Sequence, residues 1–266
     1  MCGDYMSEFR HKKKFGQNFL NNSAILDKII SKADINSNSL VLEVGPGKGA
    51  LTEKLASTAK NVLCYEIDTD LNEILSKKFS GTSVKIIFDD FLNRDLNKDI
   101  SCYKYDDLYF VSNVPYYITT PILMKLMSSG LEFKKIVMMV QEEVGERFSA
   151  CVGSKNYGSI TVYLNYFFNI KREFKVSRNN FTPVPNVDSE VVSFTRKDIT
   201  NCVKNKDIFY KLIRDSFQFK RKTIRNNLKK YNLDVIEEVL KKNDLSLSSR
   251  AEQIPVDIFV EISNKL

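Results

Sequence analysis

Residues 39–55, SLVLEVGPGKGALTEKL, limit the possible folds of this chain more than any other stretch. The apolar first half predicts a strand that is buried on both faces, and leucines one helical turn apart in the second half predict a helix. Three glycines separate the two halves and allow a sharp turn that a ligand can approach closely. These are Gly45, Gly47 and Gly49. We therefore expect a strand, a tight loop and a helix, with free loop N–H groups that face a nucleotide or a carboxylate.

Four more predicted strands follow, and they alternate with helical segments. They cover residues 61–67, 84–88, 108–112 and 135–140. This alternation predicts an α/β fold with a Rossmann-like, mostly parallel sheet covered on both faces, and a last alternating segment before residue 197 predicts an antiparallel strand at one edge. Ligands lie over the carboxyl ends of such strands. The residues at those ends are Gly45, Glu66, Asp90 and Asn113. Each is also a common turn residue, but their joint placement favours a binding site, and an acid at position 66 suits ribose hydroxyls.

The composition excludes several classes of protein. Of 266 residues, 43% are apolar and 27% charged, as in soluble globular proteins. No window approaches about eighteen apolar residues, so we expect no membrane span, no signal peptide and a cytoplasmic location. Five cysteines are scattered without CxxC spacing, and His11 is the single histidine. This pattern argues against a disulfide framework, a metal site and a His-based catalytic triad.

Positive charge is concentrated in the C-terminal part. The net charge is +7, and from Arg196 onward 16 Lys and Arg face 10 Asp and Glu. The same part is wholly helical in pattern. We therefore predict a first domain, 1–197, and a small basic helical domain, 198–266, that binds nucleic-acid phosphates. The expected helices are 207–219, 222–231, 234–242 and 255–266. Residues 1–20 form an arm that ends in FGQNFL, which is either a plain turn or a cap on a ligand pocket.

Residues 113–116, Asn-Val-Pro-Tyr, carry the most specific chemistry. The exocyclic amine of adenine is a poor nucleophile because its lone pair is delocalised into the ring. Acceptors for its two N–H groups pull the nitrogen toward tetrahedral geometry, and Asn113 Oδ1 and the Pro115 carbonyl supply two, the second aimed by the fixed φ of proline. Tyr116 adds a flat face for an extruded base. A lone tetrapeptide of this kind is usually a turn, but after the fourth strand of a nucleotide-binding sheet it predicts a methyl-transfer site.

Two interpretations stay open at this point. Gly45, Gly47 and Ala50 also fit the G-x-G-x-x-A pattern of NAD-binding proteins, although no Tyr-Lys or His-acid pair for hydride transfer accompanies it. Phe181 lies in a proline-stiffened loop, where it either stacks on a base or is an ordinary buried side chain.

The order of these motifs resembles the rRNA adenine N6,N6-dimethyltransferase family over nearly the whole chain. The motifs are FGQNFL, EVGPGKGALT, the strand ending in Glu66, Asp90, NVPYYITTPIL and FTPVPNVDSEVVSF. Two C-terminal segments, FQFKRKTIRNNL and SRAEQIPVDIFVEIS, are similar to the branch that modifies small-subunit rRNA rather than to the Erm type. The departures are Val114, where leucine or isoleucine is usual, and Lys220, where arginine is common.

The resemblance implies a class I methyltransferase that uses S-adenosylmethionine. The implied cofactor-binding residues are Asn18, Leu20, Gly45, Glu66, Asp90 and Asn113, with Glu66 on the ribose and Asp90 on the adenine amine. Asn113, Pro115 and Tyr116 would hold the target adenine, and Phe181 would stack on its other side.

The implied substrate is a pair of adjacent adenines in the 3'-terminal hairpin loop of small-subunit (16S) rRNA, presented in an immature ribosomal subunit. The alternatives are an Erm-type enzyme, which methylates large-subunit (23S) rRNA, and a largely non-catalytic, RNA-binding assembly factor. We expect no metal and a monomer.

Overall fold

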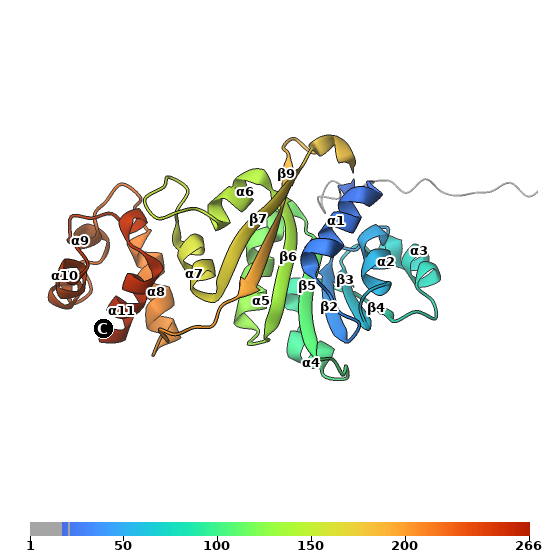
Figure 1. Ribbon diagram of the computed structural model, residues 1–266, viewed down its shortest axis with the longest axis horizontal. Coiled ribbons are helices and arrows are strands. Elements are labelled where there is room, and N and C mark those ends of the chain that lie inside the picture. Colours follow the sequence, from blue (N-terminus) through green and yellow to red (C-terminus); the bar gives the residue numbers. More distant parts are fainter. Residues whose placement is uncertain (1–17, 21) are drawn as a thin grey trace, which may run out of the picture. The chain divides into compact units, whose positions relative to one another are not determined.

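The computed structural model describes residues 18–20 and 22–266, so His11 and the rest of the predicted arm before Asn18 lie outside the described residues (Figure 1). The strands are β1 (Phe19–Leu20), β2 (Ser39–Val44), β3 (Asn61–Glu66), β4 (Val84–Phe88), β5 (Asp107–Asn113), β6 (Phe133–Gln141), β7 (Phe168–Val176), β8 (Phe181–Thr182) and β9 (Ser189–Arg196). The helices are α1 (Ser23–Ala33), α2 (Ala50–Ala56), α3 (Asn72–Lys78), α4 (Leu96–Ile100), α5 (Thr119–Ser128), α6 (Glu142–Phe148), α7 (Ser159–Phe167), α8 (Lys206–Ser216), α9 (Ile224–Asn227), α10 (Leu233–Lys242) and α11 (Val256–Lys265). Short 3-10 turns are η2 (Thr69–Leu71), η3 (Phe91–Asn93), η4 (Tyr116–Ile118), η5 (Arg178–Asn180) and η6 (Ala251–Gln253).

The main sheet has seven strands in the order β4-β3-β2-β5-β6-β9-β7. Parallel pairing joins β4 to β3, β3 to β2, β2 to β5 and β5 to β6. The chain runs outward from β2 to β4 and then continues at β5 on the other side of β2, so the strand order reverses between β2 and β5. A ligand site is expected at the carboxyl ends of the strands beside that reversal. The predicted α/β fold with a mostly parallel sheet and an antiparallel edge is confirmed.

Both faces of the sheet are buried. On one face, side chains of β2 and β3 such as Val41 and Val62 pack in one core cluster with α1 and α2, including Ile29 and Leu55. The alternate strand residues, among them Leu42, are fully buried as well. Because side chains alternate between faces along a strand, this explains the continuous apolar runs in the sequence.

The segment before α1 reaches a distant part of the chain. β1 pairs antiparallel with β8, and this pairing sets Leu20 opposite Phe181. Helix α1 then begins after Asn22, whose side chain accepts a hydrogen bond from Ala24 N at 3.0 Å and so caps the helix. The two-strand pair therefore fixes where residues 18–20 lie relative to the sheet.

The contacts divide the chain into two compact units. The first runs to Gln141 and adds Glu173–Ser193, and the second consists of Glu142–Arg172 and Phe194–Leu266. Residues 142–172 group with the C-terminal helices because side chains such as Tyr157 share their core. The separate domain that the sequence predicts from residue 198 stays a prediction.

Within the second unit, α8, α10 and α11 match predicted helices, but the helix expected at 222–231 is wrong in length. Helix α9 covers Ile224–Asn227 alone. Its first N–H groups, of Ile224 and Arg225, donate to the carbonyls of Ser249 and Leu247 at 2.8 and 3.0 Å, so this segment is held by the 247–249 loop rather than by a long helix.

Within residues 18–20 and 22–266, no helix combines the length and the apolar character that crossing a membrane requires.

Candidate cofactor and methyl-transfer site

One cavity of about 330 Å³ lies at the carboxyl ends of the parallel strands, and this volume is within the range of cofactor sites. Its lining includes eight of the nine residues that the sequence singles out. They are Asn18, Leu20, Gly45, Glu66, Asp90, Asn113, Pro115 and Tyr116. The structure therefore brings these eight residues together, whereas the role of each stays a prediction.

The glycine loop between β2 and α2 needs its glycines. Gly45, Gly47 and Gly49 all have positive φ, at 70°, 58° and 75°, which costs other residues free energy. A Cβ on Gly47 would lie 2.5 Å from Phe19 Cε1, so the side chain of β1 closes over the loop at this point. At these positions the loop backbone therefore has a conformation that glycine adopts more readily than any other residue.

The prediction of free N–H groups on this loop is wrong for the three glycines. Gly45 N donates to Tyr65 O at 2.8 Å, Gly49 N donates to Pro46 O at 2.8 Å, and Gly47 N donates to Glu66 Oε2 at 3.1 Å. The tight turn brings each N–H to an internal acceptor. The glycine N–H groups therefore do not form an anion cradle.

Glu66 is the last residue of β3, lines the cavity and is 4% exposed. Besides the bond from Gly47 N, its carboxylate accepts one from Asp68 N at 2.9 Å, to Oε1. Burial raises the pKa of Glu66, while hydrogen bonds from the backbone N–H groups of Asp68, Gly47 and Ile67 oppose that rise. A carboxylate offers about four lone-pair sites, so this group can still accept a bond from a ribose hydroxyl.

Asp90 lies after β4 and caps the turn η3. Its Oδ1 accepts from Leu92 N at 2.9 Å, and its Oδ2 lies 3.4 Å from Asn93 Nδ2. Leu92 and Phe91 also line the cavity, and Phe91 is buried against Tyr65 with ring centroids 5.1 Å apart. The segment thus combines a fixed carboxylate with apolar side chains, an arrangement that suits a purine ring and its amine.

The Asn-Val-Pro-Tyr turn lies on the same cavity at the end of β5. Asn113 Nδ2 donates to Asn18 O at 3.3 Å, which leaves Oδ1 as the acceptor of this amide. Pro115 has φ −58°, and its carbonyl accepts from Ile118 N at 3.2 Å, so one lone pair of that oxygen remains. The Tyr116 hydroxyl is hydrogen-bonded to the buried Ser189 hydroxyl, and this bond fixes the ring.

Phe181 is the one predicted site residue that the cavity lining does not include. It is 2% exposed and belongs to the core cluster between the sheet and α1, where its β8 strand pairs with Leu20. Stacking of Phe181 on a target adenine stays a prediction.

Sequence reasoning missed Glu43, an acid within the apolar strand β2. It is fully buried, lines the cavity, and accepts a bond from the Thr52 hydroxyl at 2.7 Å, with Cys64 Sγ 3.5 Å away. Burial is the main cause that raises the pKa of Glu43 to about 7. The sequence did contain a signal for this residue, a carboxylate within an apolar strand. Burying an acid costs free energy, so such a residue indicates a specific role or partner at that position.

The cavity is acidic and suits a cationic ligand. Four acidic residues line it, Glu43, Glu66, Asp89 and Asp90, against one lysine, Lys48. A sulfonium compound with an amino-acid end, such as S-adenosylmethionine, carries positive charge that this lining favours. A dinucleotide pyrophosphate is disfavoured by the carboxylates and by the bonded glycine N–H groups. Among the described residues, no cluster of His, Cys, Asp and Glu suited to a metal ion is present.

The sequence matches the family Ribosomal RNA adenine dimethylase over residues 8–266. The chain belongs to this family. A Ribosomal RNA small subunit methyltransferase A from Fusobacterium nucleatum is 41% identical over 261 residues, which cover 96% of this chain and 97% of that protein. A protein of the same name from Bacillus pumilus is 41% identical over 268 residues, with 97% and 92% covered.

Two solved structures are similar in fold over most of both chains. A dimethyladenosine transferase from Plasmodium falciparum has a TM-score of 0.76 and 29% identity, and covers 92% of this chain and 95% of its own. The 23S rRNA methyltransferase ErmE has a TM-score of 0.73 and 25% identity, with 94% and 99% covered. Family membership confirms the predicted enzyme class, an adenine dimethyltransferase, and S-adenosylmethionine as its methyl donor.

Proposed function

We propose that this protein dimethylates N6 of two adjacent adenines in the 3'-terminal hairpin loop of small-subunit rRNA, within an immature ribosomal subunit. One observation carries the proposal: the Asn-Val-Pro-Tyr turn and the carboxylates of Glu66 and Asp90 line one cavity. The names of the relatives at 41% identity support the small subunit as the source of the rRNA.

The residues at the strand ends fit S-adenosylmethionine. We assign Glu66 to the ribose hydroxyls and Asp90 to the adenine amine, because each residue lines the cavity and its carboxylate is held by backbone N–H donation. Asn18, Leu20 and Gly45 would enclose the methionine end. When bound, the cofactor supplies a methyl group on a positively charged sulfur.

The target adenine is assigned to the Asn-Val-Pro-Tyr turn. Asn113 Oδ1 and the Pro115 carbonyl each have a lone pair to accept an N–H of the adenine amine. Both acceptors shift electron density toward N6 and set its orientation. The Tyr116 ring, held by Ser189, supplies a face for the base. No side chain has to remove a proton before the nitrogen attacks, so most of the rate comes from positioning.

The C-terminal helices supply a surface for RNA phosphates. Between α8 and α9, the chain exposes a run of cations, Lys220, Arg221 and Lys222, with Arg225 in α9. Phe219, beside this run, is 55% exposed. Cations next to an exposed aromatic ring fit a nucleic acid, since phosphates pair with the cations and a base stacks on the ring.

A methyl-transfer assay tests the function. Labelled S-adenosylmethionine is offered with unmethylated small subunits and, in parallel, with protein-free large-subunit rRNA, and the modified nucleoside is identified by mass. We expect dimethyladenosine in the small subunit alone, at the two loop adenines.

Label in the large-subunit rRNA would instead indicate an Erm-type enzyme, which the similarity to ErmE keeps as the second candidate. Label in neither would indicate a non-catalytic assembly factor. A monomeric state and a cytoplasmic location remain part of the proposal.

A further inference from the structure

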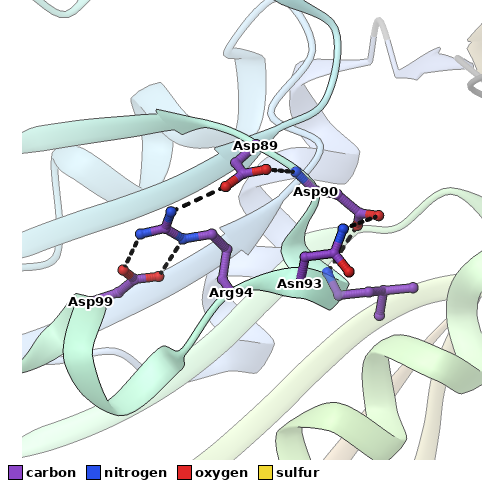
Figure 2. A network of polar contacts seen from close by, with 6 residues as sticks. Asp89, Asp90, Asn93, Arg94 and Asp99 are labelled. Carbon is purple, nitrogen blue, oxygen red and sulfur yellow. Dashed lines mark hydrogen bonds and ion pairs between the residues drawn. The ribbon is translucent and has the colours of Figure 1, made fainter.

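Arg94 lies outside the cavity lining but is bonded to the segment that carries Asp90 (Figure 2). Its Nη1 donates to Asp89 Oδ2 at 3.1 Å. On the other side, its Nε donates to Asp99 Oδ2 at 3.1 Å and its Nη2 bonds Asp99 Oδ1. The guanidinium therefore bridges a carboxylate at the cavity and a carboxylate of α4.

The two carboxylates differ in burial. The Asp99 side chain is 4% exposed, whereas that of Asp89 is 45% exposed. A planar guanidinium matches a carboxylate with two parallel bonds, so the pair with Asp99 is a fixed anchor. Asp89 is the more exposed partner of the two. The Arg94 guanidinium lowers the pKa of Asp89, so this carboxyl stays ionised and bonded at neutral pH.

From Asp89 the bonds continue to the cavity. Asp89 Oδ1 accepts from Asp90 N at 2.8 Å, and Asp90 Oδ1 in turn accepts from Leu92 N at 2.9 Å. The carbonyl of Leu92 accepts from Lys125 Nζ of α5 at 2.8 Å. The segment that carries Asp90 is thus held by Arg94 at one end and by Lys125 at the other.

We propose that Arg94 is a positioning residue for recognition of the cofactor's adenine. It holds the 89–92 segment so that the Asp90 carboxylate keeps its free lone pairs toward the exocyclic amine. This inference rests on the proposed function, in which Asp90 accepts from that amine. Without Arg94, Asp89 loses the cation that links it to α4, and the buried Asp99 loses its ion-pair partner in this network.

Calorimetric titration with the demethylated cofactor and its deaminated analogue tests the inference. S-adenosylhomocysteine carries the amine, whereas S-inosylhomocysteine carries a carbonyl oxygen at the same position, from which a carboxylate cannot accept a bond. We expect the wild-type protein to prefer the adenosyl compound by about tenfold or more, which corresponds to about 1.4 kcal/mol. In Arg94→Gln, the preference should fall to about threefold or less, with little change in affinity for the inosyl compound.

Two further variants and a control define the effect. Arg94→Lys keeps the charge but not the two parallel bonds, and should restore part of the preference. Asp89→Ala removes the link from Arg94 to Asp90 N, and should lower the preference as well. Lys134→Gln is the control, since it removes another surface ion pair of the same unit, with Asp107 at 2.8 Å, and should keep the wild-type preference.

The outcomes separate the two levels of the proposal. If wild-type protein binds both compounds equally, Asp90 does not read the amine, and the adenine assignment fails together with the inference. If wild-type protein discriminates and Arg94→Gln discriminates equally well, the inference alone is overturned. An equal loss of affinity for both compounds in Arg94→Gln also overturns it, because that pattern indicates general loosening. If Arg94→Gln does not fold, unchanged preferences in Arg94→Lys and Asp89→Ala overturn it.

Discussion

Glu43 allows a specific prediction about stability, because its carboxyl is buried and the Thr52 hydroxyl is its one hydroxyl donor. Its pKa rises from 4.5 to about 7 on folding. The folded state therefore holds a proton that the unfolded state releases between these values, and stability falls as the pH rises through this range. At about 1.4 kcal/mol per pH unit, the full loss is about 3 kcal/mol.

Replacing Glu43 with Gln removes the ionisation and keeps an oxygen that can accept from the Thr52 hydroxyl. Relative to wild type, Glu43→Gln should gain about 2–3 kcal/mol of unfolding free energy between about pH 5 and about pH 8. Urea unfolding followed by circular dichroism at several pH values measures this difference. The matched control is Glu53→Gln, which changes a carboxylate that is 66% exposed.

For Glu53→Gln, the difference from wild type should stay flat over the same range, because the pKa of Glu53 is lowered rather than raised by its bond to Lys78. Parallel stability curves for wild type and Glu43→Gln would refute the reasoning. They would mean that the folded state ionises Glu43 as readily as the unfolded chain does.

Three further outcomes follow from the proposed roles. Asn113→Ala should reduce turnover by about a hundredfold or more while S-adenosylmethionine affinity changes by less; an unchanged rate in a single-turnover assay would remove Asn113 from catalysis. Glu66→Ala should weaken cofactor binding by about ten- to a hundredfold, because a charged acceptor is worth about 1.5–3 kcal/mol, and equal binding by calorimetry would reject the ribose assignment. Neutralising Lys220, Arg221 and Lys222 together should lower the salt slope of subunit binding by about 2; an unchanged slope would place the RNA contact elsewhere.

The sequence predicted the sheet and most of the cavity because both depend on local patterns. Apolar runs mark strands that are buried on both faces, and parallel strands bring their carboxyl ends together, so Gly45, Glu66, Asp90 and Asn113 had to meet. Arg94 was not predictable in this way, because its importance comes from contacts with Asp89 and Asp99 that no periodicity encodes.

Long-range pairing explains two other differences. The two-residue strand β1 is too short to leave a pattern, yet its pairing with β8 places Phe181 opposite Leu20 in the core. An aromatic residue in a proline-rich loop fits a buried position and a stacking position equally well by sequence. The same limit applies to α9, where bonds to the 247–249 loop replace the expected helix.

The glycine loop illustrates how one sequence pattern serves two chemistries. In a dinucleotide-binding loop, free backbone N–H groups hold a pyrophosphate, and the same G-x-G-x-x-A spacing fits that use. Here the N–H of Gly47 donates to Glu66, and the N–H groups of Gly45 and Gly49 donate to backbone carbonyls. The Gly47 N–H thus stabilises a carboxylate of the protein instead of a phosphate of the ligand. That carboxylate, together with Asp90, makes the cavity attractive to a cation. The partners of the N–H groups, rather than the glycine spacing, therefore favour a sulfonium cofactor over NAD.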